Sequence, residues 1–104
     1  MLLLAVVPQA GEAQLGDYEC RYHTYPETVE LLERWTEATS ELSRLYSIGK
    51  SQSGSMDLWM VGMTNRATGP AEEKPAAYFD GNQHDNEVMG GETALHLVWW
   101  ILSR

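Results

Sequence analysis

The fold of this chain is decided by the polar turn Asp80-Gly81-Asn82-Gln83-His84-Asp85-Asn86-Glu87, which lies between a short apolar run and a long one. The short run, Ala76–Phe79, has the composition of a buried strand. The long run, Val88–Leu102, is apolar almost all round and has the length of a helix. A strand that leads through a turn into a helix is typical of α/β folds, in which ligands bind beyond the carboxyl ends of the strands.

A candidate pair of metal ligands lies in this turn. His84 and Glu87 are three positions apart, and imidazole nitrogen and carboxylate oxygen both bind Zn²⁺ at roughly 2.0–2.2 Å. Two such side chains at one point would supply half of a tetrahedral site. The alternative is a solvated turn, in which Glu87 caps the helix dipole and His84 bonds to the backbone.

Length and composition limit what the chain can be. At 104 residues it can form one domain, and 43% hydrophobic residues is too high for a disordered chain. The formal net charge of −8 argues against a nucleic-acid or anionic-membrane partner, because both attract basic surfaces. Since Cys20 is the only cysteine, an internal disulfide and a cysteine-built zinc site are excluded.

The amino-terminal end carries a weak targeting signal. Met1–Val7 is apolar but short against the roughly 7–15 residues of a signal-peptide core, and no Lys or Arg precedes it. Small residues follow at Ala10, Gly11 and Ala13, where a cleavage site would lie. We interpret residues 1–17 as a clipped or mis-started signal peptide, or else a flexible lead-in. The first interpretation predicts a secreted or periplasmic protein.

An amphipathic helix is predicted to follow. Thr24 and Glu27 fit a capping box, and Pro26 is tolerated in the first turn because the amides there lack partners. Apolar residues then recur every three or four positions, which predicts that the helix continues to about Leu45. These residues are Val29, Leu32, Trp35, Ala38, Leu42 and Leu45.

A β-hairpin is predicted after this helix. Its first arm is an extended segment that ends at Ser51, and Ser51–Ser55 forms the turn. The second arm, Asp57–Thr64, has large apolar side chains on both faces and is therefore predicted to lie inside a sheet. Asn65–Pro75 is predicted to be an exposed loop.

The last predicted helix needs more protein around it than the chain supplies. Val88–Leu102 is too short to span a membrane, and its apolar surface on all sides predicts burial in a larger protein. The elements before it are too few to cover both of its sides. We therefore expect the chain to be the front part of a longer protein.

The order of these features resembles the amino-terminal part of the zinc carboxypeptidases, the M14 metallopeptidases. The matching features are an amphipathic helix, Ser47–Ser51, the turn at Gly54, the strand Leu58–Val61, Pro75 before the strand into Gly81, and His84 and Glu87 at the head of a helix with Gly90-Gly91-Glu92. The resemblance covers about residues 18–104. It implies an α/β fold that is the front portion of a three-layer mixed-sheet domain: helix, β-hairpin, strand and buried helix.

The resemblance also implies a chemistry. His84 and Glu87 are the first two protein ligands of a catalytic Zn²⁺, and the complete enzyme hydrolyses the carboxy-terminal peptide bond of a peptide or protein through a zinc-activated water. The third ligand, a histidine, and the general-base glutamate are expected downstream, so this chain contains no catalytic residue. We expect the isolated chain to bind zinc weakly and to have no peptidase activity.

The remaining polar candidates are weaker. His96 lies nine residues beyond Glu87, about 180° round the same helix, and His23 has no ligand-like neighbour in the sequence. Both are predicted to be core or surface histidines. Asp85 and Asn86 are candidates to orient the ligands, or are simple turn residues. Asn86, where digestive members of the family have arginine, and Gly54-Ser55, where the family usually has Gly-Arg, leave the substrate preference open.

Two other functions stay open. A zinc-dependent deacylase of amino-acid conjugates shares the same ligand pair, although the hairpin at Ile48–Ser51 favours the peptidase. A non-catalytic α/β interaction module would instead use the tryptophans as a core or a partner surface; these are Trp35, Trp59, Trp99 and Trp100. No obligate partner is inferred.

Overall fold

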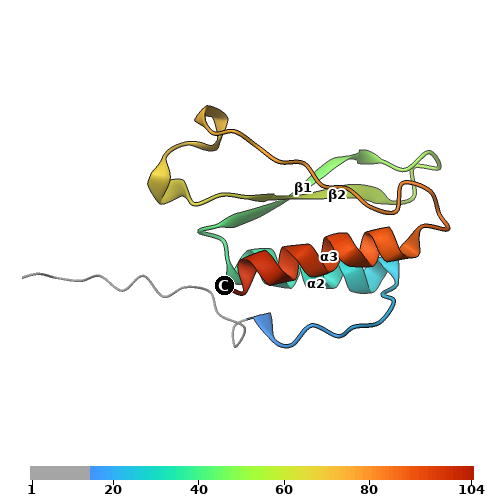
Figure 1. The fold of residues 1–104 in the computed structure, drawn as a ribbon. Helices are drawn as coiled ribbons and strands as arrows, with labels where there is room; N and C mark the ends of the chain where they lie inside the picture. Colours follow the sequence, from blue (N-terminus) through green and yellow to red (C-terminus); the bar gives the residue numbers. More distant parts are fainter. Residues whose placement is uncertain (1–14) are drawn as a thin grey trace, which may run out of the picture.

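The structure is a computed structural model that describes residues 15–104 (Figure 1). Its elements are α2 (Tyr25–Ala38), β1 (Ser43–Lys50), β2 (Asp57–Met63), the 3₁₀ turns η1 (Arg66–Thr68) and η2 (Ala71–Glu73), and α3 (Val88–Leu102). The interpretation of Met1–Val7 as a signal peptide lies outside the described residues. In this part of the chain, no helix is long and apolar enough to cross a membrane.

The predicted start of α2 is confirmed. Glu27 donates its backbone N–H to the Thr24 hydroxyl, and the Glu27 carboxylate accepts the backbone N–H of Thr24 at 2.7 Å. This reciprocal capping box satisfies two amides that have no partner within the helix.

The predicted end of this helix is wrong, because α2 stops at Ala38 and Leu45 lies in β1. The Thr39 hydroxyl bonds to the carbonyl of Trp35 at 2.8 Å and to the Ser43 hydroxyl at 2.7 Å. Arg66 binds the carbonyl of Ser40 at 2.8 Å, in the turn that follows. Because these side chains satisfy backbone groups in a non-helical conformation, the helix ends here although the apolar spacing continues beyond it.

The predicted hairpin is confirmed. β1 and β2 pair antiparallel, with Ser43 opposite Met63 and Ser47 opposite Trp59, and the register shifts before Lys50. One face of the hairpin packs on the core through Leu45, Trp59, Val61 and Met63. The other face carries Tyr46, Ile48, Leu58 and Met60, which are exposed. Among residues 15–104 the sheet has these two strands alone, so β2 is not flanked on both sides as predicted.

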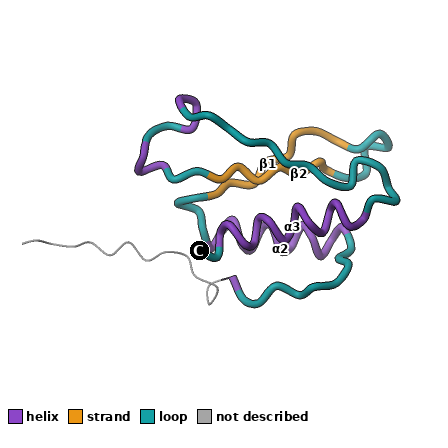
Figure 2. Tube along the Cα trace, in the orientation of Figure 1, coloured by secondary structure: helices purple, strands orange, loops and turns teal. Residues whose placement is uncertain are grey.

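The predicted buried strand Ala76–Phe79 is not formed. Figure 2 shows this segment as loop, and Tyr78 and Phe79 are 72% and 68% exposed. A strand needs a neighbour for its backbone N–H and C=O groups, and none of the described residues pairs with this segment. The preceding loop, Asn65–Pro75, is mostly exposed as predicted and contains η1 and η2.

The core lies where the two helices, the hairpin and the segment before α2 meet. Both helices lie on one side of the hairpin, and residues 15–24 run along the far side of the helices (Figure 1). Among residues 15–104, five hydrophobic residues are buried: Leu15, Leu32, Trp35, Leu95 and Leu102. Trp59 and Trp99 are partly buried against this cluster, whereas Trp100 is 44% exposed. The tryptophans are therefore mostly core residues.

The limits of α3 agree with the prediction, and the other elements of residues 15–104 leave part of the helix exposed, as expected from their small number. Its burial in a larger protein stays a prediction. Leu95 and Leu102 are its only buried hydrophobic residues, and Val88, Met89, Trp100 and Ile101 are exposed. None of the segments in residues 15–104 covers the outer side of α3. The apolar sequence of the helix thus exceeds what this part of the chain buries.

Candidate metal site

His84 and Glu87 converge at the head of α3. The Nδ1 atom of His84 lies 3.0 Å from Oε1 of Glu87, and the other carboxylate oxygen accepts the backbone N–H of His84 at 3.2 Å. The two side chains are 71% and 52% exposed. Glu87 is the N-cap residue of α3, but its side chain makes no hydrogen bond to the helix and contacts the backbone and the imidazole of His84 instead.

The donor atoms of this pair fit one zinc ion. Two ligands at 2.0–2.1 Å from a tetrahedral ion have donor atoms about 3.3 Å apart, and the nitrogen and oxygen here are separated by 3.0 Å. The high exposure of both side chains leaves these atoms accessible from solvent. Nitrogen with oxygen is also a donor set that suits Zn²⁺.

The turn that carries the pair packs closely on the first turn of α3. A Cβ atom on Gly81 would lie 2.1 Å from the carbonyl oxygen of Gly90, and one on Gly91 would lie 3.2 Å from Cβ of Asn82. Asn82 itself has a φ of 60°, which asparagine tolerates better than most residues. Glycine is therefore needed for this approach. In the sequence, Gly90-Gly91 counted only as part of the family resemblance. Two glycines in the first turn destabilise a helix, and this signal could have indicated that another segment packs on them.

The structure does not complete the site from the other histidines. His23 is a buried histidine, and its Nδ1 lies 2.9 Å from the carboxylate of Glu92, a neighbour that is distant in the sequence. His96 stacks on Tyr18, with 4.6 Å between ring centroids. Within residues 15–104, no three His, Cys, Asp or Glu side chains gather closely enough to hold a metal.

The two residues between the ligands make no polar contact with them in the structure. Asp85 and Asn86 are exposed, and among the described residues neither side chain hydrogen-bonds to His84 or Glu87. Their proposed role in orienting the ligands stays a prediction.

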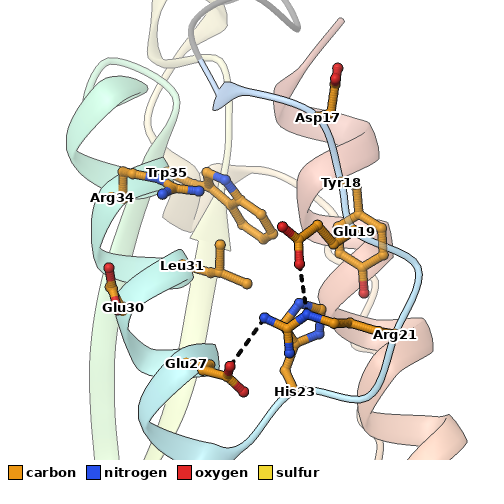
Figure 3. Close-up of a pocket in the computed structure, with 10 residues that line it drawn as sticks. All are labelled: Asp17, Tyr18, Glu19, Arg21, His23, Glu27, Glu30, Leu31, Arg34 and Trp35. Carbon is orange, nitrogen blue, oxygen red and sulfur yellow. Dashed lines mark hydrogen bonds and ion pairs between the residues drawn. The ribbon is translucent and has the colours of Figure 1, made fainter.

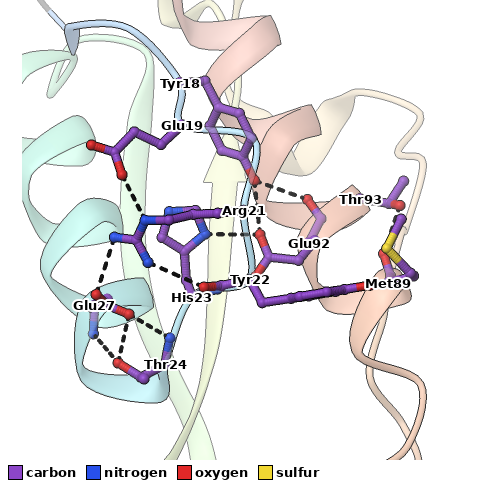
Figure 4. Close-up of polar contacts among 10 residues, drawn as sticks. All are labelled: Tyr18, Glu19, Arg21, Tyr22, His23, Thr24, Glu27, Met89, Glu92 and Thr93. Atoms are coloured by element: carbon purple, nitrogen blue, oxygen red, sulfur yellow. Dashed lines mark hydrogen bonds and ion pairs between the residues drawn. The ribbon is translucent and has the colours of Figure 1, made fainter.

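Glu92, on α3, is the centre of a partly buried polar cluster (Figure 4). It accepts the backbone N–H of His23 at 2.6 Å and the Tyr18 hydroxyl at 3.0 Å. Burial alone would raise the pKa of Glu92, but the hydrogen bonds from His23 and Tyr18 together hold that pKa below its usual value. Burial and the neighbouring Glu92 carboxylate raise the pKa of the Tyr18 hydroxyl. Glu92 is therefore a stabilised carboxylate.

A small pocket lies elsewhere, between the segment before α2 and α2 itself (Figure 3). Its volume is about 230 Å³, and neither His84 nor Glu87 lines it. Arg21 crosses it and forms ion pairs with Glu19 at 2.6 Å and Glu27 at 3.1 Å. Hydrogen bonds from Thr24 and Arg21 lower the pKa of Glu27 to about 2. We assign the pocket a structural role, since the arginine within it, Arg21, is held by two carboxylates of the pocket's own lining.

These carboxylates predict a loss of stability in acid. In the folded chain the pKa values of Glu27 and Glu92 lie below the usual 4.5. Protonation of these carboxylates below pH 4.5 therefore favours the unfolded chain. The thermal midpoint, followed by circular dichroism, should be constant above pH 4.5 and fall as the pH decreases toward 2. The Glu27→Gln variant should show a shallower fall, and Glu30→Gln, at an exposed position of the same helix, should follow the wild type. A midpoint unchanged down to pH 2 would contradict this prediction.

Comparison with known proteins identifies the family. The profile of the zinc carboxypeptidases matches residues 28–104. The chain belongs to the zinc carboxypeptidase family. The match includes both predicted zinc ligands, whereas Tyr18 and His23 lie before it.

Individual carboxypeptidases support the same membership. Carboxypeptidase SOL1 of Arabidopsis thaliana is 39% identical over 80 residues, which cover 77% of this chain and 16% of that protein. Carboxypeptidase Z of Mus musculus is 32% identical over 82 residues, 79% of the chain and 12% of that protein. A zinc carboxypeptidase of Saccharothrix mutabilis subsp. capreolus is 33% identical over 93 residues, 88% of the chain and 20% of that protein. The chain thus spans a fifth or less of these relatives, and no solved structure matches it significantly.

Proposed function

We propose that residues 18–104 are the amino-terminal part of the catalytic domain of a zinc metallocarboxypeptidase. The observation that carries this proposal is the 3.0 Å approach of His84 Nδ1 to Glu87 Oε1, at the head of α3 and inside the matched region. The two helices and the hairpin would then form the front of a three-layer domain with a mixed sheet. Further strands of that domain would pair with the edges of the hairpin, and its outer layer of helices would cover the hairpin's exposed face.

In this proposal His84 and Glu87 are the first two zinc ligands. Metal ligands must be deprotonated, and a bound zinc ion would be held by Nδ1 of His84 and Oε1 of Glu87, the two atoms that lie 3.0 Å apart. The bound metal supplies Lewis-acid activation of water and of the scissile carbonyl group.

The rest of the machinery is proposed to lie downstream of this chain. It comprises the third ligand, a histidine, and the general-base glutamate. The substrate would be a peptide or protein with a free carboxyl terminus, and the protein would be secreted or periplasmic. The deacylase alternative has less support, because the relatives reported above are all named carboxypeptidases.

A peptidase assay on the full-length protein tests this proposal. Full-length protein should release the last residue from a peptide with a free carboxyl terminus, and 1,10-phenanthroline should abolish the activity until zinc is restored. The same peptide with an amidated terminus is the matched control and should be cleaved poorly. The isolated 104-residue chain should be inactive. Hydrolysis of N-acyl amino acids in preference to peptides would favour the deacylase, and chelator-insensitive cleavage would contradict both.

A further inference from the structure

The segment before α2, residues 15–24, runs along the two helices on the side away from the hairpin (Figure 1), and we call it the strap. Its Gly16 carbonyl accepts the indole N–H of Trp99 at 2.9 Å, and Leu15 is buried in the core. The ring of Tyr18 lies between the two helices, 6.2 Å from the Trp35 ring of α2 and 4.6 Å from the His96 ring of α3. The strap therefore ties α3 to the rest of the fold.

The closest polar contact between strap and helix is made by Glu92. Oε1 accepts the backbone N–H of His23 at 2.6 Å, and Oε2 meets His23 Nδ1 at 2.9 Å and the Tyr18 hydroxyl at 3.0 Å. The His23 and Glu92 side chains are 2% and 15% exposed (Figure 4). A buried carboxylate held through both oxygens has one orientation, so α3 has little freedom to rotate or slide beneath the strap.

A short chain of contacts connects Glu92 to the metal-ligand pair. Glu92 lies about 7.5 Å along the helix axis from Glu87, at 1.5 Å per residue. Between them, Gly90 packs against Gly81 so closely that a methyl group on Gly81 would overlap the Gly90 carbonyl. A shift of α3 at Glu92 would therefore also move the turn that carries His84, because these backbone segments have no space to absorb it.

We propose that Glu92 is a positioning residue for the zinc site: held by His23 and Tyr18 of the strap, it keeps His84 and Glu87 converged on one ion. The inference rests on the proposed function. It adds that two residues before the region matched by the family profile, Tyr18 and His23, act on the zinc site. Both precede residue 28, where the match begins.

Zinc affinity separates this role from a merely structural one. In Glu92→Gln, an amide NH₂ group replaces one of the carboxylate oxygens that accept hydrogen bonds from the strap. One hydrogen bond is then lost, and two hydrogen-bond donors face each other. We expect zinc to bind the full-length protein about 5-fold more weakly in this variant, the size of effect known for residues coupled to a site through intervening contacts. Tyr18→Phe removes one hydrogen bond and should weaken binding about 2-fold.

The measurement is competition for zinc alone against a chromophoric chelator, at a temperature where circular dichroism shows each variant to be folded. The background is Cys20→Ser, because Cys20 is exposed and a cysteine thiolate would compete as a zinc ligand. Thr93→Ala is the matched control: its exposed hydroxyl bonds within α3 to the Met89 carbonyl, and zinc affinity should not change. Thermal midpoints are recorded for every variant.

The outcomes distinguish this inference from the proposed function. Weaker zinc binding in Glu92→Gln and Tyr18→Phe, with Thr93→Ala unchanged, would support it. If Glu92→Gln does not fold, Tyr18→Phe tests the positioning role: weaker zinc binding would support it, and unchanged zinc binding would overturn it. Lower thermal midpoints with wild-type affinity in both variants, while His84→Ala binds weakly, would overturn the positioning role and leave the zinc site standing. Equal affinity in His84→Ala and the wild type would overturn the zinc site and this inference with it.

Discussion

Replacing Gly81 by alanine is expected to lower the free energy of unfolding by about 1–3 kcal/mol, the usual cost of forcing an extra methyl group into a packed contact. The new Cβ would lie 2.1 Å from the Gly90 carbonyl oxygen and 2.9 Å from the Gly91 nitrogen. Both are backbone atoms of α3, so no side-chain rotation can relieve the overlap. The turn must separate from the helix, and the metal-ligand pair must move with it.

Urea denaturation of Gly81→Ala, followed by circular dichroism, measures this cost. Gln83→Ala is the matched control, because Gln83 is exposed in the same turn and should leave stability within about 0.5 kcal/mol. A Gly81→Ala variant as stable as the wild type would show that the turn does not pack on α3 as described.

Replacing His84 by alanine is expected to weaken zinc binding by more than about 10-fold. Loss of a residue that only supports a ligand costs 10–100-fold in known sites, and His84 is proposed to be a ligand itself. Glu87→Gln should have a comparable effect, since an amide oxygen carries no charge for the ion. Isothermal titration of zinc into each variant, in the Cys20→Ser background, measures the change.

Thr93→Ala provides the control for the His84 variant. It removes an exposed hydroxyl group that bonds only within α3, to the Met89 carbonyl, and should bind zinc like the wild type. Identical affinity in His84→Ala and the wild type would leave the non-catalytic interaction module as the better account of this chain.

Local signals in the sequence predicted local structure well. The capping box of Thr24 and Glu27 set the start of α2, the apolar run of α3 gave its limits, and the turn of serines and glycine between two apolar segments gave the hairpin. The approach of His84 to Glu87 also followed from their spacing at the start of a helix. Each of these features depends on residues close together in the chain.

Features that depend on distant contacts were not predictable in the same way. The end of α2 is set by Thr39, Ser43 and Arg66, which satisfy backbone groups that a periodic pattern does not reveal. The segment Ala76–Phe79 has the composition of a strand but lacks a neighbour in the described part of the chain. The contact between His23 and Glu92 joins residues 69 positions apart, so no local pattern pointed to it.

Crystals of the protein loaded with zinc, measured at the zinc absorption edge, test the central claim most directly. The account predicts an anomalous peak bonded to the imidazole of His84 and the carboxylate of Glu87, at roughly 2.0–2.2 Å from each. A peak on His23 and Glu92 or on Cys20 instead, with His84 and Glu87 still hydrogen-bonded only to each other and to the turn, would contradict it.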